Sequence, residues 1–366
     1  MHLAPLFCRL LPALVALLLS MPANAAATSA NSASAPVKPS FKVCWSIFAG
    51  WMPWGYAGQE QIINKWADKY GIQIAVEEVP DYVNSIEQYT AGKFDGCAMT
   101  NMDALTIPAA TGVDSTALII GDFSSGADGI LLRGQGLNLR DLKGKTILLV
   151  ENSVSHYLLS RALELAQFSE SDVKIQNVSD TEIVQAFLAG QGDAVITWNP
   201  LLESIKQQTA VSQVYSSHWI PGEIIDLMVV NTATLAAHPE LGKALTGAWF
   251  ETQRLVGAHN AEGAAVRAKM AAAANTSADD FDAQLKTLRS FYSPRAALNF
   301  ANSDKLPLLM QRVVNFADAQ QLLGAQGSGL QQLGISFSDG RVLGNPAQIK
   351  LRFDPTYLQQ ASNGQL

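Results

Sequence analysis

Aromatic residues gather in the segment WSIFAGWMPWGYA, residues 45–57, which contains three tryptophans and one tyrosine. The segment follows a short apolar run and is expected to be a loop. An indole ring attracts a cation placed over its face, with an energy of about 0.5–2 kcal/mol that depends on desolvation. The segment therefore predicts a site for a cationic group with Trp51 and Trp54 as contacts. The alternative is that these rings cover a sheet edge or contact a partner.

Acidic residues, and no lysine or arginine, occupy the segments that are expected to face a ligand-binding cleft together with residues 45–57. No lysine or arginine occurs in residues 45–57, 100–106, 121–130, 151–157, 196–203 and 219–229. Their acids are Asp103, Asp122, Asp128, Glu151, Glu203, Glu223 and Asp226. This negative field disfavours an oxyanion, whereas a flat cation can donate two parallel hydrogen bonds to one carboxylate. The chemistry predicted for the cleft is capture of a planar cation.

The candidate ligand-binding residues are Trp51, Trp54, Asp103, Asp122, Glu151, Ser153, Trp198, Asn199 and Asp226. Several have a structural role as the alternative. Asp103 is also placed to cap the helix that follows it, and Glu151 precedes a helix N-terminus whose dipole stabilises a carboxylate. Capping is the favoured role of Ser153, and Asp226 could serve only as a charge at a hinge.

Residue patterns typical of catalysis do not occur in the sequence. The motifs G-x-S-x-G and H-E-x-x-H are absent, and the five histidines are scattered along the chain. Nucleophilic catalysis needs a serine or cysteine beside a positioned histidine, and metal sites need clustered ligands. We therefore expect no enzyme activity, no cofactor and no metal. A periplasmic enzyme on the same fold is the remote alternative.

Alternating strands and helices must position these residues. Apolar runs near residues 41–50, 72–79 and 95–100 are separated by helical patterns over 59–70 and 84–92. The same order recurs from residue 140 to 198, and QYTAGKFDGCAMTNMD resembles AFLAGQGDAVITWNP in its helix, Ala-Gly turn, aspartate and strand. This βαβαβ order predicts two α/β lobes, each a mainly parallel sheet flanked by helices. Ligands of such sheets bind beyond the carboxyl ends of the strands.

Lobe boundaries are expected at two glycine-containing crossings, residues 124–129 and 220–224, because glycine can absorb hinge rotation. Lobe 1 is predicted to comprise residues 41–125 and 225–366, including a C-terminal extension, and lobe 2 residues 126–224.

The N-terminus predicts export. Residues 1–25 contain Arg9, an apolar run and Ala-Asn-Ala, which is typical of a cleaved secretory signal peptide. Residues 26–40, rich in Ala, Ser, Pro and Asn, are expected to be a flexible leader. Without the signal, 24 basic residues face 32 acidic ones, a net charge of −8 that disfavours nucleic acid and anionic membranes as partners. Cys44 and Cys97 remain; a disulfide is possible, but two buried thiols are favoured because pairing across neighbouring strands is geometrically demanding.

The chain resembles the periplasmic substrate-binding proteins of ABC transporters of the nitrate/sulfonate/taurine type. The resemblance is carried by VCWSIFAGWMPWGYA, YTAGKFDGCAMTN, LRDLKGKTILLVENSVSHYLL and IVQAFLAGQGDAVITWNPLLES, in this order, over residues 41–205. It implies the type II, two-lobed "Venus flytrap" fold. It also implies a periplasmic, monomeric receptor that delivers a small solute to a membrane permease driven by an ATPase.

Two further stretches, VCWSIFAGWMPWGYAGQ and LGNPAQIKLRFDPTYLQQ, resemble the subgroup associated with urea or guanidine carboxylase systems. Together with the acidic, aromatic cleft, this resemblance favours guanidinium as the ligand. Urea is the nearest alternative and would need amide partners such as Asn101 or Asn199. Nitrate, sulfonate or taurine comes next.

Overall fold

A computed structural model describes residues 38–323 and 329–366. The predicted signal peptide and residues 26–37 of the predicted leader lie outside the described residues. Ser40, the last residue assigned to that leader, instead begins the first strand. The two-lobed α/β fold expected from the sequence is confirmed, with one lobe built on each of two sheets.

The first lobe contains an eight-stranded sheet with the strand order β12-β11-β13-β4-β10-β3-β1-β2. Its strands are β1 (Ser40–Trp45), β2 (Gln73–Glu78), β3 (Gly96–Thr100), β4 (Ser115–Phe123), β10 (Ile225–Asn231), β11 (Gly334–Ser336), β12 (Val342–Gly344) and β13 (Ile349–Phe353). β1, β2 and β3 are parallel, whereas β10 runs antiparallel to both β3 and β4. The chain thus returns to the first sheet through β10, as the sequence predicts.

The second lobe contains a five-stranded sheet with the order β7-β6-β8-β5-β9. Its strands are β5 (Asp128–Arg133), β6 (Thr146–Leu149), β7 (Lys174–Asn177), β8 (Ala194–Trp198) and β9 (Val211–Ser216). This order matches the β2-β1-β3-β10-β4 part of the first sheet strand for strand. The repeated unit inferred from the sequence is therefore present. In each lobe the strand that arrives from the other lobe, β10 in the first and β5 in the second, runs antiparallel to both of its neighbours.

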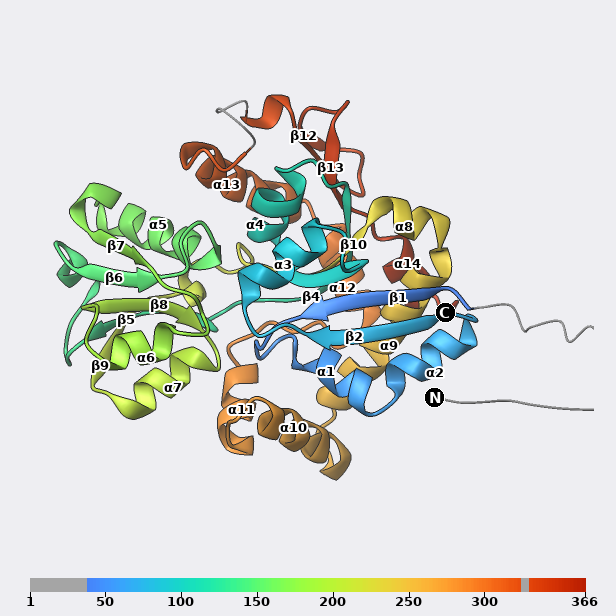
Figure 1. Cartoon of the computed structure of the whole chain (residues 1–366), viewed down its shortest axis with the longest axis horizontal. Coiled ribbons are helices and arrows are strands. Elements are labelled where there is room, and N and C mark those ends of the chain that lie inside the picture. Colours follow the sequence, from blue (N-terminus) through green and yellow to red (C-terminus); the bar gives the residue numbers. More distant parts are fainter. Residues whose placement is uncertain (1–37, 324–328) are drawn as a thin grey trace, which may run out of the picture. The chain divides into compact units, whose positions relative to one another are not determined.

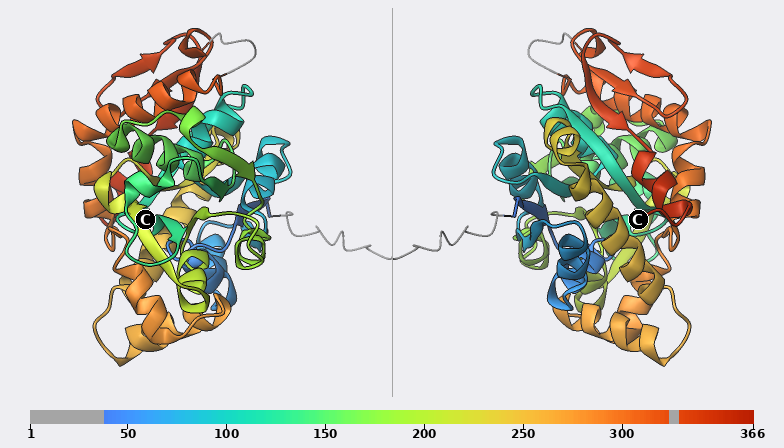
Figure 2. Two further views of the ribbon diagram at one scale, coloured as in Figure 1. Left: turned by 90° about the vertical axis from the view of Figure 1, so that its left-hand side faces the viewer. Right: turned by 90° about the vertical axis from the view of Figure 1, so that its right-hand side faces the viewer.

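Helices cover both faces of each sheet. They are α1 (Met52–Gln59), α2 (Ile62–Lys69), α3 (Tyr82–Thr90), α4 (Asn101–Ala104), α5 (Val154–Ala166), α6 (Ile183–Leu188), α7 (Leu201–Gln208), α8 (Thr232–Ala237), α9 (Pro239–Val256), α10 (Ala261–Ala273), α11 (Ala278–Leu285), α12 (Pro294–Ala301), α13 (Lys305–Ala319) and α14 (Thr356–Ser362). In the second lobe α5 lies on one face of the sheet and α6 and α7 lie on the other (Figure 1). The side views show the C-terminal strand β13 running beside β4 (Figure 2).

The sequence predicts that the whole aromatic segment is a loop, and this is wrong for its second half, because Met52 begins helix α1. Pro53 occupies the first turn of that helix, where the missing N–H costs no hydrogen bond. The four apolar side chains buried along α1 include Trp54. The segment after β1 therefore contributes a loop that ends near Trp51 and a packed helix that follows it.

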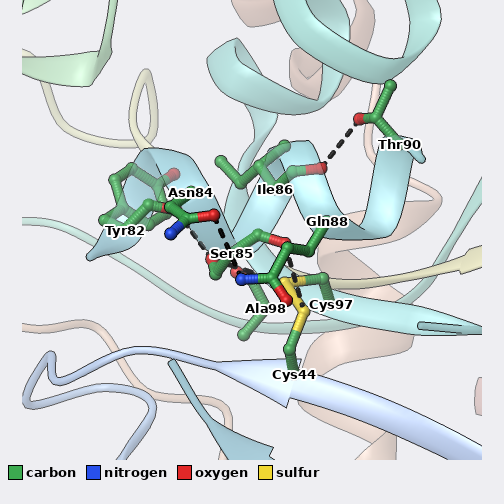
Figure 3. The surroundings of a disulfide bond; sticks show 9 residues. All are labelled: Cys44, Tyr82, Asn84, Ser85, Ile86, Gln88, Thr90, Cys97 and Ala98. Atoms are coloured by element: carbon green, nitrogen blue, oxygen red, sulfur yellow. Dashed lines mark hydrogen bonds between the residues drawn. A yellow bond between two sulfur atoms is a disulfide. The ribbon is translucent and has the colours of Figure 1, made fainter. Parts of the chain in front are cut away.

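A disulfide joins Cys44 on β1 to Cys97 on β3, and the expectation of two free thiols is wrong (Figure 3). The two residues are direct partners in the parallel pairing of these strands, with their Cα atoms 4.4 Å apart. This separation lies within the range that a disulfide spans, which strand position along the sequence alone does not reveal. α3 lies over the disulfide, with Ser85 beside it (Figure 3).

No helix among the described residues is long and apolar enough to cross a membrane. The described residues likewise contain no group of three or more histidine, cysteine or acidic side chains arranged to hold a metal ion.

Candidate functional site

A row of polar side chains crosses the first sheet where β3 and β4 end and β10 begins. Asp226 on β10 pairs with Thr100 on β3 on one side and with Asp122 on β4 on the other. A register shift follows Asp226, between it and Leu227. Because strands of the two directions meet here, residues more than a hundred positions apart lie next to one another.

A small cavity of about 10 Å³ lies between this row and the second sheet. It is lined by Phe48, Trp51, Tyr82, Thr100, Asp128, Val154, Trp198, Ile224 and Asp226. Asp128 and Trp198 come from the second sheet, where they are paired across β5 and β8. A cavity needs roughly 10–15 Å³ to hold one water molecule, so the surrounding side chains leave almost no free space here.

Asp122 and Asp226 form a buried carboxyl pair at the floor of the cavity. They are 0% and 2% exposed and lie directly opposite each other on the paired strands β4 and β10. Burial raises the pKa of both groups above the ordinary aspartate value, and for Asp226 the charge of Asp122 raises the pKa further. Two carboxylates in contact favour a state in which they share one proton.

Two more aspartates surround the pair. Burial raises the pKa of Asp128 to about 7 and that of Asp103 to about 6. The Tyr82 hydroxyl donates to Asp103 Oδ2 at 2.6 Å, and the Thr100 hydroxyl donates to the same atom at 2.7 Å. These donors partly offset the cost of burying the Asp103 carboxylate.

Carboxylate oxygens in this cluster lack hydrogen-bond partners. Among the described residues, both oxygens of Asp122 and one each of Asp103, Asp128 and Asp226 are buried and receive no donor from another group. An unpaired buried acceptor costs about 1–3 kcal/mol, more when charged. None of the described residues that line the cavity is a lysine, arginine or histidine. The cluster therefore has an unmet capacity for donors and positive charge.

Aromatic rings form the walls of the cavity. Trp51 lies 5.3 Å from Tyr82 between ring centroids, and Tyr82 lies 5.5 Å from Trp198 in an edge-to-face arrangement. Phe48 packs edge-on against Trp51 at 5.1 Å. Rings held by such contacts have little freedom to reorient, so they present fixed π faces and edges to an occupant.

The second crossing between the sheets is fixed by a buried ion network around Glu223. Its carboxylate accepts hydrogen bonds from Tyr157 and Arg161 on α5 at 2.6 and 2.8 Å, and from Arg312 on α13 at 3.1 Å. The negative charge of Glu223, predicted to face the cleft, is thus neutralised by arginines from outside the predicted cleft segments. Asn101 binds the same crossing, receiving the N–H of Ile225 and donating to the Glu223 carbonyl.

Hydrogen bonds also bridge the two lobes around the cavity. The N–H of Ala49 donates to the carbonyl of Asn199 at 3.3 Å, and the N–H of Tyr82 donates to Asp180 at 3.3 Å. The Ser179 hydroxyl donates to Asp81 at 2.7 Å. The cavity is consequently enclosed by residues from both lobes.

Five of the predicted site residues lie in or directly behind the cavity: Trp51, Asp103, Asp122, Trp198 and Asp226. Asp103 is not the N-cap of the following helix, because Thr100 takes that position and its side chain accepts from the Asp103 N–H.

The other four predicted residues lie elsewhere. Trp54 is 1% exposed and stacks on Trp249 at 4.7 Å, inside the first lobe. Glu151 is exposed, and its N–H is bound by Asn177. Ser153 caps α5, and the next residue, Val154, lines the cavity. Asn199 is buried outside the cavity lining, and its side chain donates to the Thr287 hydroxyl at 3.4 Å.

Sequence reasoning left Phe48, Tyr82 and Asp128 out of the candidate set, although they line the cavity. Phe48 and Asp128 lie in segments that the sequence predicts to face the cleft, but residue type alone does not distinguish them from their neighbours in those segments. Tyr82 lies at the start of α3 in a segment not expected to face the cleft. The signal that could have found it is its position directly after the second strand, at the carboxyl edge of the sheet.

Solved structures share this architecture. The alkanesulfonate-binding protein SsuA of Xanthomonas axonopodis pv. citri, bound to MOPS, aligns with a TM-score of 0.64 and 18% identity, covering 78% of this chain and 95% of SsuA. The periplasmic nitrate-binding protein NrtA of Synechocystis PCC 6803 aligns with a TM-score of 0.56 and 12% identity, covering 91% and 100%. At these identities the likeness establishes the fold. The desulfurization enzyme DSZB also shares it, with a TM-score of 0.54 and 14% identity, covering 77% and 93%.

Sequence comparison gives the family. A curated relative from Brucella abortus (strain 2308), named only as a candidate binding protein, is 25% identical over 181 residues, which are 49% of this chain and 56% of the relative. The chain thus spans about half the length of the curated relatives it matches. The NMT1/THI5-like family matches residues 56–253, more than half of the chain. The chain therefore belongs to the NMT1/THI5-like family.

Proposed function

We propose that this protein is the solute-binding receptor of an ABC importer and that its ligand is a small planar cation, guanidinium. The observation that carries the proposal is the cluster of Asp103, Asp122, Asp128 and Asp226, whose buried oxygens lack donors beside a cavity walled by aromatic rings. Guanidinium is a donor-only cation whose N–H groups match carboxylates in pairs, and its flat face suits an indole.

The receptor role is supported by the names of two proteins with a similar fold. SsuA and NrtA are named as binding proteins for sulfonates and nitrate, respectively, and NrtA as periplasmic. By analogy we infer a periplasmic location, a monomer, and a membrane permease and ATPase as partners. The same names make sulfonate and nitrate the alternatives to guanidinium, and urea is a further one. An oxyanion, however, would meet carboxylates and no cationic side chain among the described residues of the cavity.

Lobe closure is the mechanism we infer for capture. Asp226, Thr100 and Trp51 come from the first lobe, and Asp128 and Trp198 from the second. A ligand that binds one set first and then contacts the other stabilises the closed arrangement, because only that arrangement offers both sets. The hydrogen bonds that bridge the lobes, such as Ala49 to Asn199, reinforce the same arrangement.

Calorimetric titration of the purified protein with guanidinium chloride, urea, nitrate and taurine tests the proposal. We expect heat and saturation with guanidinium, and weak or no binding of nitrate and of taurine, a zwitterion that carries a sulfonate. Recovery of unchanged guanidinium after incubation separates a receptor from an enzyme on the same fold. Saturable binding of nitrate or taurine, with guanidinium inert at millimolar levels, would refute the cation assignment.

A further inference from the structure

Four buried carboxylates surround a cavity that a monocation can neutralise only in part. Asp103, Asp122, Asp128 and Asp226 are each at most 4% exposed, and no described residue lining the cavity carries a positive charge. Were all four ionised, one bound positive charge would leave three negative charges in a dry site. Coulomb repulsion at short distance in such surroundings is strong. The cluster must therefore retain protons, and more of them when it is empty than when it is loaded.

Asp122 and Asp226 are the pair best placed to hold the exchangeable proton. They are register partners on the adjacent strands β4 and β10, and side chains directly opposite each other in such a pair are near neighbours, with Cβ atoms about 4.5–5.5 Å apart. Neither oxygen of Asp122 has a donor from any other described group. The backbone of Gly50 closes the space beyond it, since a Cβ built on that glycine would lie only 2.8 Å from Asp122 Oδ2. A proton held between the two carboxyl groups supplies these oxygens with the donor that they otherwise lack.

We propose that the Asp122–Asp226 pair holds a proton while the cavity is empty and releases it to solvent when the cation binds, so that the site exchanges a proton for its ligand. The inference rests on the proposed function, because the exchange requires a cationic ligand. Asp226 lines the cavity and Asp122 lies behind it. A cation bound to Asp226 takes the place of the proton as a partner of that carboxylate, and its charge favours the ionised form of the pair. Asp122 is thus a positioning residue that sets the charge of the site without lining it.

The acidic groups near the Asp122–Asp226 pair favour retention of its proton in the empty site. Asp128 on β5 and Asp103 on α4 add negative potential, which favours proton retention in the empty site. Tyr82 faces Asp103 as a hydroxyl donor, with a pKa raised by burial. Glu223, three residues before Asp226, is paired with Arg161 and Arg312, and these two arginines neutralise its charge.

The test is calorimetric titration with guanidinium chloride in two buffers of different protonation enthalpy. At neutral pH we expect the apparent binding enthalpies to differ in proportion to the release of close to one proton per ligand. By linkage, a release of one proton makes the affinity rise about tenfold per pH unit, so binding should strengthen about tenfold from pH 6 to pH 7.

The variant D122N isolates the pair. An asparagine at this position can donate to Asp226 permanently, as the protonated carboxyl does, without a titrating proton. We expect D122N to bind guanidinium with much less proton release and a flatter pH dependence. The control E151Q removes an exposed carboxylate outside the cavity and should keep both the release and the slope.

Each outcome is decisive. Guanidinium binding with identical heats in both buffers and equal affinity at pH 6 and pH 7 overturns the exchange and leaves the receptor function standing. Proton release that persists undiminished in folded D122N overturns the assignment to this pair. If D122N does not fold, as judged by circular dichroism, the wild-type heats in the two buffers decide the exchange. Absence of guanidinium binding at every pH overturns the proposed function together with the exchange.

Discussion

Individual carboxylates in this protein have different roles according to whether a cationic side chain is near. Asp226 is buried beside other aspartates and has an oxygen without a donor. Glu223, three residues earlier, is equally buried but is bound by two arginines. An unpaired buried acid needs a proton or an external cation, whereas a paired one does not. A nearby cationic side chain therefore distinguishes acids that stabilise the fold from acids that are free to bind a ligand.

Replacement of Asp226 by asparagine should weaken guanidinium binding by about tenfold or more. A hydrogen bond to a charged group contributes roughly 1.5–3 kcal/mol, and the neutral amide keeps the shape of the side chain. Calorimetric titration of the variant measures the loss. Glu151→Gln, on an exposed residue, should bind as the wild type does. Equal affinity of both variants would place Asp226 outside the ligand site.

The two tryptophans of the aromatic segment should respond oppositely to replacement by leucine. Trp51→Leu removes a ring from the cavity wall and should weaken guanidinium binding by roughly 3- to 30-fold, the equivalent of a cation–π contact. Trp54→Leu breaks the stack on Trp249 and should lower the free energy of unfolding by roughly 2–4 kcal/mol with little change in affinity of the folded protein. Parallel titration and urea unfolding distinguish the two. Loss of affinity in Trp54→Leu but not in Trp51→Leu would reverse the assignment.

Elements of secondary structure hold the site in place through the first sheet. β3 leads into α4 with Asp103, and β1 leads into the segment with Trp51. The disulfide between Cys44 and Cys97 ties these two strands together directly beneath α3, which carries Tyr82 at its start (Figure 3). Three of the elements that surround the cavity are therefore anchored at one point.

Removal of this disulfide should destabilise the protein. The bond closes a loop with a sequence separation of 53 residues, and loss of a cross-link of that length costs roughly 2–4 kcal/mol in the unfolded-state entropy account. Urea unfolding of the Cys44→Ala, Cys97→Ala double variant measures the change in the free energy of unfolding. The untreated wild type and the wild type kept in reducing agent are the controls. No difference among the three would mean that the disulfide does not contribute to stability.

The whole molecule is held at its second crossing by Glu223, which connects α5 of the second lobe with α13 of the first. Glu223→Gln leaves Arg161 without its buried partner and should lower the free energy of unfolding by about 3 kcal/mol, since breaking one side of a buried ion pair exposes the cost of the remaining charge. Thermal or urea unfolding tests this. Glu203→Gln, which removes a surface pair with Lys206, should cost less than about 1 kcal/mol. A small effect at Glu223 would show that the arginines find other partners.

The aspartate cluster should also give the ligand-free molecule an unusual dependence of stability on pH. A carboxyl whose pKa is raised on folding binds its proton more tightly in the folded state, so its contribution is lost as pH rises from about 4 to the folded pKa. For Asp103, raised to about 6, the loss is roughly 3 kcal/mol, and Asp128, raised to about 7, extends the window upward.

These acids should therefore make ligand-free protein less stable at pH 7.5 than at pH 5.5, and guanidinium chloride at low millimolar concentration should raise the melting temperature more at pH 7.5. Differential scanning calorimetry at the two pH values measures both effects, and sodium chloride at the same concentration is the control. Equal stabilisation at both pH values would contradict the role of the cluster.

Much of the fold follows from the sequence. Hydrophobic runs separated by helical patterns predicted both sheets, the return of the chain through β10 and the repeated βαβαβ unit, because these patterns are local. The positions after β1 and β3 also pointed to Trp51, which lines the cavity, and to Asp103, which is hydrogen-bonded to the lining residues Tyr82 and Thr100; their role in ligand binding stays a prediction. Trp54 was misplaced because helix α1 begins two residues earlier and turns its ring toward Trp249 rather than toward the cavity.

The two α/β lobes and the acidic, aromatic character of the cleft follow from local periodicity and residue type, and both can be predicted from the order of the residues. Which acids remain unpaired depends on the folded arrangement. Asp122 meets Asp226 through the antiparallel register of β4 and β10, and Glu223 meets Arg161 and Arg312 through contacts between distant helices. The charge state of a buried carboxyl is set by neighbours in space, and chain order does not contain those distances.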